Sequence, residues 1–98
     1  MSQLRKPYQV DGIADEIRPA TLAPFVSWVA PSPGEIRAAL QAVGWTGEGF
    51  AKTIGVNPRT ARRWLGGDAD IPYAAWAVLC TAAGFGNIWE KGDEAPRG

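Results

Sequence analysis

The stretch from residue 46 to residue 66 restricts the possible folds of this chain more than any other part of its sequence. It places a small helix residue, Ala51, four positions before a glycine, Gly55. Two helices can cross at a steep angle over a short turn only if a small side chain lies where they touch and the turn tolerates positive φ. Ala51 meets the first condition and Gly55 meets the second. The spacing therefore predicts two short helices joined by a tight turn.

Apolar residues on both sides of this turn are spaced so that they face one common core. They are Phe50, Ile54, Val56, Ala61, Trp64 and Leu65. The arginines of the second predicted helix, Arg59, Arg62 and Arg63, all fall outside this apolar set. We therefore expect a helix that buries one side and presents basic side chains on the other.

Both ends of that second helix carry recognisable signals. Asn57 is a favourable N-cap, and Pro58 suits the first helical position because it lacks an N–H and has a fixed φ. Gly66 and Gly67 supply the stop. The predicted helix covers residues 58–65.

Two earlier helices are also framed by their start signals. Ser32 and Glu35 form a capping box with a proline between them, so a helix begins there and runs to about Val43, followed by a glycine cap. Thr46 is the predicted N-cap of the next helix, over residues 47–54.

A last helix follows the basic one. Asp70 is its predicted N-cap, and it begins at Ile71 and ends at Gly84. Tyr73 and Val78 make it apolar around more of its circumference than one small core needs, which implies a second buried contact. Its inward face is predicted to hold Trp76, Leu79, Cys80 and Ala83.

The N-terminal third lacks helical periodicity and contains four prolines. Within it, residues 22–29 are too apolar to extend into water, so we expect a short strand or an extended arm laid over the helices. The predicted organisation is an arm over 1–31 used for packing or dimerisation, a helical domain over 32–91 and a flexible tail over 92–98.

Composition excludes several classes of protein. Ten Lys and Arg residues balance ten Asp and Glu residues, which argues against a protein that coats any phosphate backbone. The charge is nonetheless uneven, because residues 52–63 hold four cations and no acid. We therefore expect local charge, rather than the total, to decide where a polyanion docks.

Catalysis, metal binding and membrane insertion find little support. The chain has no histidine and a single cysteine, Cys80, so neither an intramolecular disulfide nor a zinc site is expected. There is no paired-carboxylate motif, no glycine-rich phosphate loop and no nucleophile beside a base, so no enzyme and no cofactor are predicted. Neither a signal peptide nor a membrane span is visible, and we expect a cytoplasmic protein.

Residues 32–84 resemble the helix-turn-helix of the Cro/repressor (Xre-type) family of small prokaryotic regulators. Five spaced positions carry the resemblance, namely Ala51, Gly55, Val56, Ala61 and Trp64. The resemblance implies an all-α, lambda-repressor-like domain of four to five helices with an extended N-terminal arm. It also implies sequence-specific binding of double-stranded DNA, with helix 58–65 in the major groove.

The family positions assign roles to single residues. Arg59 and Arg63, four residues apart, are the expected base contacts, because arginine can donate two bonds to guanine. Arg62 and Thr60 are assigned to a phosphate or to the base edge nearest the backbone. The expected DNA backbone contacts are Thr46, Gly47, Glu48, Lys52 and Asn57.

One departure from the family pattern bears on affinity. The loop after the basic helix, often basic in the family, here carries Asp68 and Asp70. One short helix with three arginines gives only weak, salt-sensitive attachment, so a homodimer on an inverted-repeat operator is expected. The last helix, residues 22–29 and Trp89 are the predicted dimer surfaces. By resemblance the protein is a transcriptional repressor of the kind found on plasmids or phages, acting near its own promoter.

Other interpretations stay open at this stage. An arginine doublet on a helix is often only a solvated surface, and Arg5 with Lys6 fits either a minor-groove arm or a polar terminus. Trp64 and Trp76 are expected in the core rather than stacked on bases. The alternative function is an antitoxin or adaptor that keeps the helix-turn-helix and binds a partner protein through the apolar arm or tail.

Overall fold

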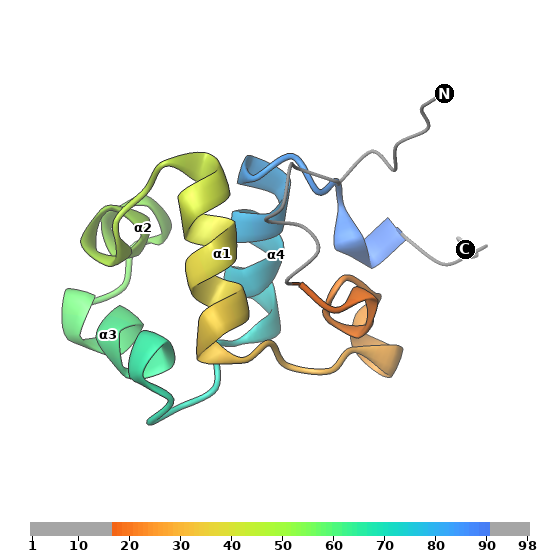
Figure 1. Cartoon of the computed structure of the whole chain (residues 1–98), viewed down its shortest axis with the longest axis horizontal. Helices are drawn as coiled ribbons and strands as arrows, with labels where there is room; N and C mark the ends of the chain where they lie inside the picture. Colours follow the sequence, from red (N-terminus) through yellow and green to blue (C-terminus); the bar gives the residue numbers. More distant parts are fainter. Residues whose placement is uncertain (1–16, 91–98) are drawn as a thin grey trace.

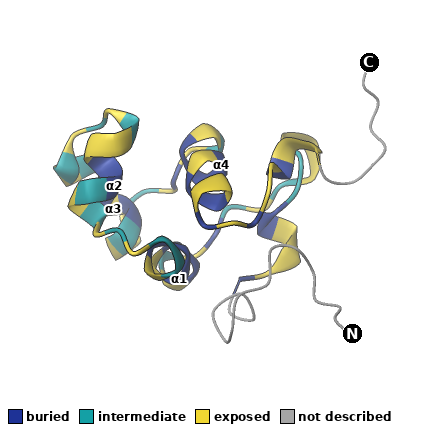
Figure 2. Cartoon of the chain, turned by 90° about the horizontal axis from the view of Figure 1, so that it is seen from above, coloured by how far each residue is buried: buried dark blue, intermediate teal, exposed yellow. Residues whose placement is uncertain are grey.

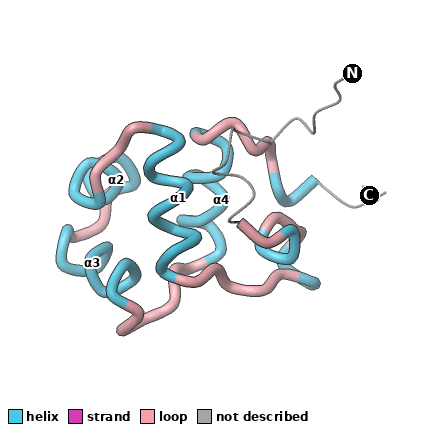
Figure 3. The backbone as a smooth tube through the Cα atoms, in the orientation of Figure 1, coloured by secondary structure: helices cyan, strands magenta, loops and turns pink. Residues whose placement is uncertain are grey.

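The computed structural model describes residues 17–90, in which every regular element is helical (Figures 1 and 3). The predicted all-α class is confirmed. The predicted tail over 92–98 and the basic pair Arg5 and Lys6 lie outside the described residues. The helices are α1 (Pro33–Val43), α2 (Gly47–Ile54), α3 (Pro58–Gly66) and α4 (Tyr73–Ala82), and the short 3-10 turns are η2 (Pro19–Thr21), η3 (Phe25–Ser27) and η4 (Ile88–Glu90).

Helix α1 begins with the predicted capping box. The Ser32 hydroxyl accepts a hydrogen bond from the Glu35 N–H at 3.2 Å, and the Glu35 carboxylate accepts one from the Ser32 N–H at 2.7 Å. Gly44 ends the helix in the left-handed conformation, with φ of 88°. The predicted bounds of this helix are confirmed.

The next two helices also match their signals. Thr46 caps α2 by accepting from the Gly49 N–H at 2.9 Å. The side chain of Asn57 accepts from the Arg59 N–H at 2.8 Å and so caps α3. Helix α3 ends at Gly66, one residue beyond the prediction. Local sequence therefore sets the bounds of both helices.

The predicted start of α4 is wrong. The helix begins at Tyr73, and Pro72 occupies the N-cap position in an extended conformation without a side-chain cap bond. Ile71 precedes a proline, and that position disfavours helical backbone angles. The helix consequently starts two residues later than expected, and Asp70 lies too far upstream to cap it.

The core lies where α1 crosses α4 and where α2 and α3 pack against them (Figure 1). Trp76 is fully buried and Trp64 is 5% exposed, which confirms that both tryptophans belong to the core. Seen from above in Figure 2, α4 lies between the α2–α3 pair on one side and the short terminal turns on the other. The largest fully buried side chains are Trp76, Phe50, Phe85, Ile36, Ile71, Leu79 and Ile88.

Residues 17–31 pack against this core through hydrogen bonds over long sequence separations. The carbonyl oxygen of Thr21 accepts from the indole N–H groups of both Trp76, at 2.7 Å, and Trp28, at 3.0 Å. The Tyr73 hydroxyl donates to the Ala23 carbonyl at 2.9 Å. The apolar stretch 22–29 therefore lies over α4, as an extended segment interrupted by the 3-10 turn η3 rather than as a strand.

An ion pair fixes the same segment to α1. The Arg18 guanidinium donates to both carboxylate oxygens of Glu35, at 2.8 and 2.9 Å, and the Arg18 N–H donates at 2.8 Å. Burial alone would raise the pKa of Glu35, but the hydrogen bonds from Arg18 and Ser32 outweigh burial and lower the pKa to about 2. The capping carboxylate of α1 thus also holds residues 17–31 in place.

Candidate nucleic-acid interface

Helix α3 separates its apolar and basic residues cleanly. Ala61 is 1% exposed and Trp64 is 5% exposed, whereas Arg59, Arg62 and Arg63 are all exposed. Arg59 and Arg63 are four residues apart and so share one face of the helix. Within residues 17–90 the three guanidinium groups form no ion pair. They therefore remain available to an external anion.

The bend before α3 rests on the predicted pair of residues. Ala51 is fully buried, and Gly55 is left-handed with φ of 83°. The N–H groups of Gly55 and Val56 both donate to the Ala51 carbonyl at 2.9 Å. A methyl group on Gly55 would meet no atom within 4 Å, so glycine is favoured here by backbone conformation and not by space.

The start of α2 carries the groups predicted to hold a phosphate. The N–H groups of Gly47 and Glu48 belong to the first turn and have no partner within the helix. The Thr46 hydroxyl accepts from Gly49 and keeps its own hydrogen to donate. Lys52 is exposed, and its ammonium lies 4.0 Å from the Glu48 carboxylate, a surface contact of little energy.

Gly47 has a packing role that its sequence context did not reveal. A methyl group at Gly47 would lie 2.7 Å from Cδ1 of Leu65, near the end of α3. A larger residue at this position would therefore require the Leu65 side chain to move. The glycine that exposes backbone N–H groups thus also gives the Leu65 side chain room to pack against the start of α2.

Arg62 and Thr60 lie on different sides of α3, because residues two apart on a helix do not share a face. Arg62 lies on the same side as Leu65, which is the side packed against the start of α2. Thr60 is half-buried, and its N–H donates to the Asn57 carbonyl at 2.8 Å. Of the two, Arg62 has the freer side chain.

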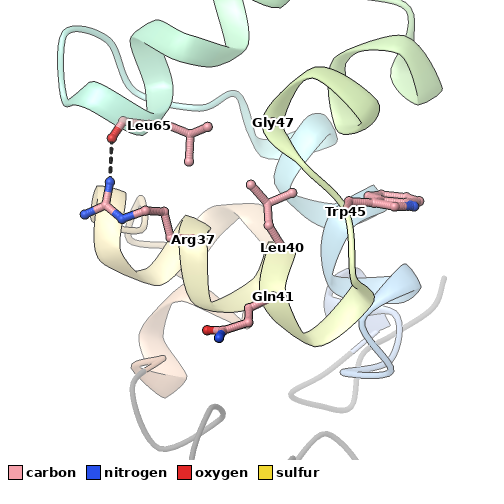
Figure 4. A pocket seen from close by; sticks show the side chains of 6 residues that line it. All are labelled: Arg37, Leu40, Gln41, Trp45, Gly47 and Leu65. Carbon is pink, nitrogen blue, oxygen red and sulfur yellow. Dashed lines mark hydrogen bonds between the residues drawn. The ribbon is translucent and has the colours of Figure 1, made fainter.

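A shallow hollow of about 440 Å³ lies between α1, the start of α2 and the end of α3 (Figure 4). Its lining residues are Arg37, Leu40, Gln41, Trp45, Gly47 and Leu65. At one edge, the Arg37 guanidinium donates to the Leu65 carbonyl at 2.8 Å. Arg37 was not predicted as a site residue. The available signal was that it is the only cation in α1.

The loop between α3 and α4 keeps both its carboxylates exposed. Asp68 and Asp70 lie at the surface, and the Asp68 N–H donates to the Arg63 carbonyl at 2.9 Å. Negative charge therefore lies directly after the basic helix.

Large apolar side chains are also exposed on elements other than α3. Val26 is 94% exposed and Phe25 is 67% exposed, both in η3, and Val78 on α4 is 45% exposed. Trp89, one of the predicted dimer contacts, is 49% exposed. A second hollow of about 310 Å³ lies beside α4 and is lined by Ile54, Val56, Trp64, Pro72, Ala74, Ala75 and Val78.

Within residues 17–90, no helix has the length and apolar character needed to cross a membrane. No cluster of three or more histidine, cysteine or acidic side chains suited to a metal ion occurs in this part of the chain.

Comparison with known proteins gives the family. The chain is 49% identical over 78 residues to the transcriptional repressor protein KorC of Escherichia coli, an alignment that covers 76% of this chain and 92% of the relative. A second Escherichia coli protein of the same name is 48% identical over 77 residues, covering 76% and 91% of the two chains. No family model matches the chain, and no solved structure matches it significantly. The chain belongs to the family of the transcriptional repressor protein KorC.

Proposed function

We propose that this repressor binds double-stranded DNA sequence-specifically, with α3 in the major groove. One observation carries the proposal: three exposed arginines lie opposite the buried Ala61 and Trp64 on a short helix that follows the bend at Gly55. An exposed α-helix is the element that fits the major groove of B-DNA.

Arg59 and Arg63 are the proposed base contacts. Both are exposed and lie on one face of α3, so they are able to point into the groove together. A guanidinium that bonds both O6 and N7 of guanine discriminates against other bases by about 1–3 kcal/mol. These two residues would therefore set most of the sequence preference.

The backbone contacts follow from the first turns of α2 and α3. At the start of α2, the Thr46 hydroxyl and the N–H groups of Gly47 and Glu48 suit a phosphate, with Lys52 one turn further along the helix. At the start of α3, the side-chain oxygen of Asn57 already caps the helix, so we assign its side-chain NH2 group to a contact with the DNA backbone. Arg62 and Thr60 are assigned to a phosphate or a nearby base edge, one on each side of α3.

We further propose that the protein acts as a homodimer on an inverted repeat. The acidic loop after α3 attracts no phosphate, and one short helix binds weakly, so two copies about 34 Å apart would supply the missing affinity. Helix α4 contains no charged residue, and its exposed Val78 borders the hollow lined by Ile54 and Val56. This neutral surface, with Trp89 and the exposed residues of η3, is the proposed contact between copies.

Repression follows from occupancy of a promoter. A bound dimer excludes polymerase without any catalytic step, and an operator near the protein's own promoter would make the repression self-limiting. The expected location is the cytoplasm, where the DNA is.

The direct test begins with recovery of bound fragments from genomic DNA, followed by titration of the enriched sequence. Arg59→Ala and Arg63→Ala should each weaken binding by about 1–3 kcal/mol and relax the preference at one position in each half-site. Lysine at either position is the matched control, because it keeps the charge and loses the two-pronged bond. Unchanged affinity and sequence preference in both alanine variants would remove the proposal.

A second candidate is an antitoxin or adaptor that binds a partner protein as well as DNA. The exposure of Phe25 and Val26 favours it, because soluble monomers rarely leave such neighbouring apolar side chains uncovered. Co-purification of a stoichiometric partner would support this candidate. A self-sufficient dimer measured by light scattering would oppose it.

A further inference from the structure

We propose that Arg37 binds a phosphodiester group of the operator backbone, at the edge of the hollow between α1, α2 and α3. The proposal rests on the DNA-binding role of α3 proposed above. It adds a contact from α1, a helix outside the helix-turn-helix, and it identifies the bound chemical group as a phosphate oxygen of duplex DNA.

The first observation is the fixed position of this charge. The Arg37 guanidinium donates one N–H to the Leu65 carbonyl at 2.8 Å, and a guanidinium has five such donors. The residue is exposed, and it forms no ion pair within residues 17–90. Arg37 therefore presents an uncompensated positive charge that is already anchored at the end of α3.

The second observation is where this anchor lies. Leu65 packs closely against Gly47 at the start of α2, and Arg62 lies on the same side of α3. Figure 4 shows Arg37 reaching from α1 to the Leu65 carbonyl, with Gly47 and Trp45 also lining the hollow. A DNA strand that passes the first turn of α2 along this side of α3 would run past Arg37.

A purely structural role is the competing explanation. An arginine near the end of a helix stabilises its last carbonyl groups, and the bond to Leu65 is of that kind. The two roles predict different salt dependence. Only a charge that neutralises a phosphate releases counterions and thus changes the slope of log affinity against log salt concentration.

The experiment measures operator binding by the full chain from about 50 to about 200 mM salt, the range in which phosphate contacts dominate the change in affinity. Arg37→Ala should weaken binding roughly tenfold, equally on operator and on unrelated DNA, and reduce the slope by about 0.9 per bound subunit. Arg37→Lys should restore the slope. Gln41→Ala, one turn along α1 at the same hollow, should match the wild type in slope and affinity.

Thermal unfolding of each variant is measured in parallel. If Arg37→Ala lowers the melting temperature and leaves the salt slope at its wild-type value, the residue serves only to hold the end of α3 and the proposal is overturned. Failure of this inference is distinguishable from failure of the proposed function. If only the inference about Arg37 fails, Arg59→Ala and Arg63→Ala still lose sequence preference. If the proposed DNA-binding role of α3 fails, these two variants bind DNA as the wild type does.

Discussion

Helices α3 and α4 have nearly equal lengths, nine and ten residues, and opposite compositions. Helix α3 buries two residues and exposes three arginines, whereas α4 has no charged residue and buries five. The sequence of α3 is governed by what it presents to solvent, and the sequence of α4 by what it covers. We therefore expect substitutions of the exposed arginines of α3 to change DNA binding. Substitutions of the buried residues of α4 should change the free energy of unfolding.

The largest expected effect tests the α4 half of this comparison. Trp76→Ala removes a fully buried side chain and the donor to the Thr21 carbonyl. It should lower the free energy of unfolding by about 3–5 kcal/mol in denaturant titrations followed by circular dichroism. Trp89→Ala, at a position 49% exposed, is the control and should cost far less. Equal losses at the two positions would contradict the division of roles.

A smaller effect concerns the segment that covers α4. The pKa of Glu35 is about 2 in the folded protein, below its ordinary value, so the unfolded chain takes up this proton first as the pH falls. The stabilisation that this lowered pKa gives to the folded protein is complete above about pH 5. As the pH falls towards about 2, the free energy of unfolding should drop by roughly 2 kcal/mol from this cause. Unfolding measured over this range should show a steeper loss in the wild type than in Glu35→Gln. Parallel curves would show that the ion pair with Arg18 adds no stability.

The bend between α2 and α3 should respond more weakly. Gly55→Ala places a side chain at φ of 83° without any clash, so only the backbone cost of about 1–2 kcal/mol is expected. Gly66→Ala is the matched control inside α3 and should stabilise by roughly 0.5–1 kcal/mol, because alanine favours a helix. A destabilised Gly66→Ala would show that this end of α3 has no room for a methyl group.

The smallest change in stability is expected on α3 itself. Arg63→Ala should alter the free energy of unfolding by no more than about 0.5 kcal/mol, since the side chain is exposed and forms no ion pair within residues 17–90. Arg18→Ala removes the same charge from an ion pair with a buried carboxylate and should cost clearly more. Comparable costs would mean that the Arg63 side chain contributes to folding.

Short-range signals predicted most of the helical frame. The bounds of α1, α2 and α3 follow from the N-caps Ser32, Thr46 and Asn57 and from the glycines that end each helix. Each of these residues acts on backbone groups only a few positions away in the sequence. The predicted start of α4 was wrong because the conformational effect of Pro72 on Ile71 outweighed the capping preference of Asp70.

Contacts between distant segments left no comparable pattern. Thr21 and Trp76 are 55 residues apart, and Arg37 and Leu65 are 28 apart. Neither hydrogen bond can therefore be predicted from the helical or strand periodicity of the sequence. Glu35 was predicted as a capping residue, but its ion pair with Arg18 was not. Helix α3 was predictable because the bend before it, its caps and its exposed face all lie within 21 consecutive residues, 46–66.

The Thr21 carbonyl gives the protein an intrinsic optical reporter. Indole emission depends on hydrogen bonding and on contact with water, and this single oxygen receives the N–H groups of two of the five tryptophans, Trp28 and Trp76. Detachment of residues 17–31 would break the bond from Trp76 and separate the Trp28 ring from Tyr73, so both indoles would become more exposed to water and the fluorescence spectrum would shift to longer wavelengths. Seating of this segment can thus be followed in unlabelled protein, with or without DNA.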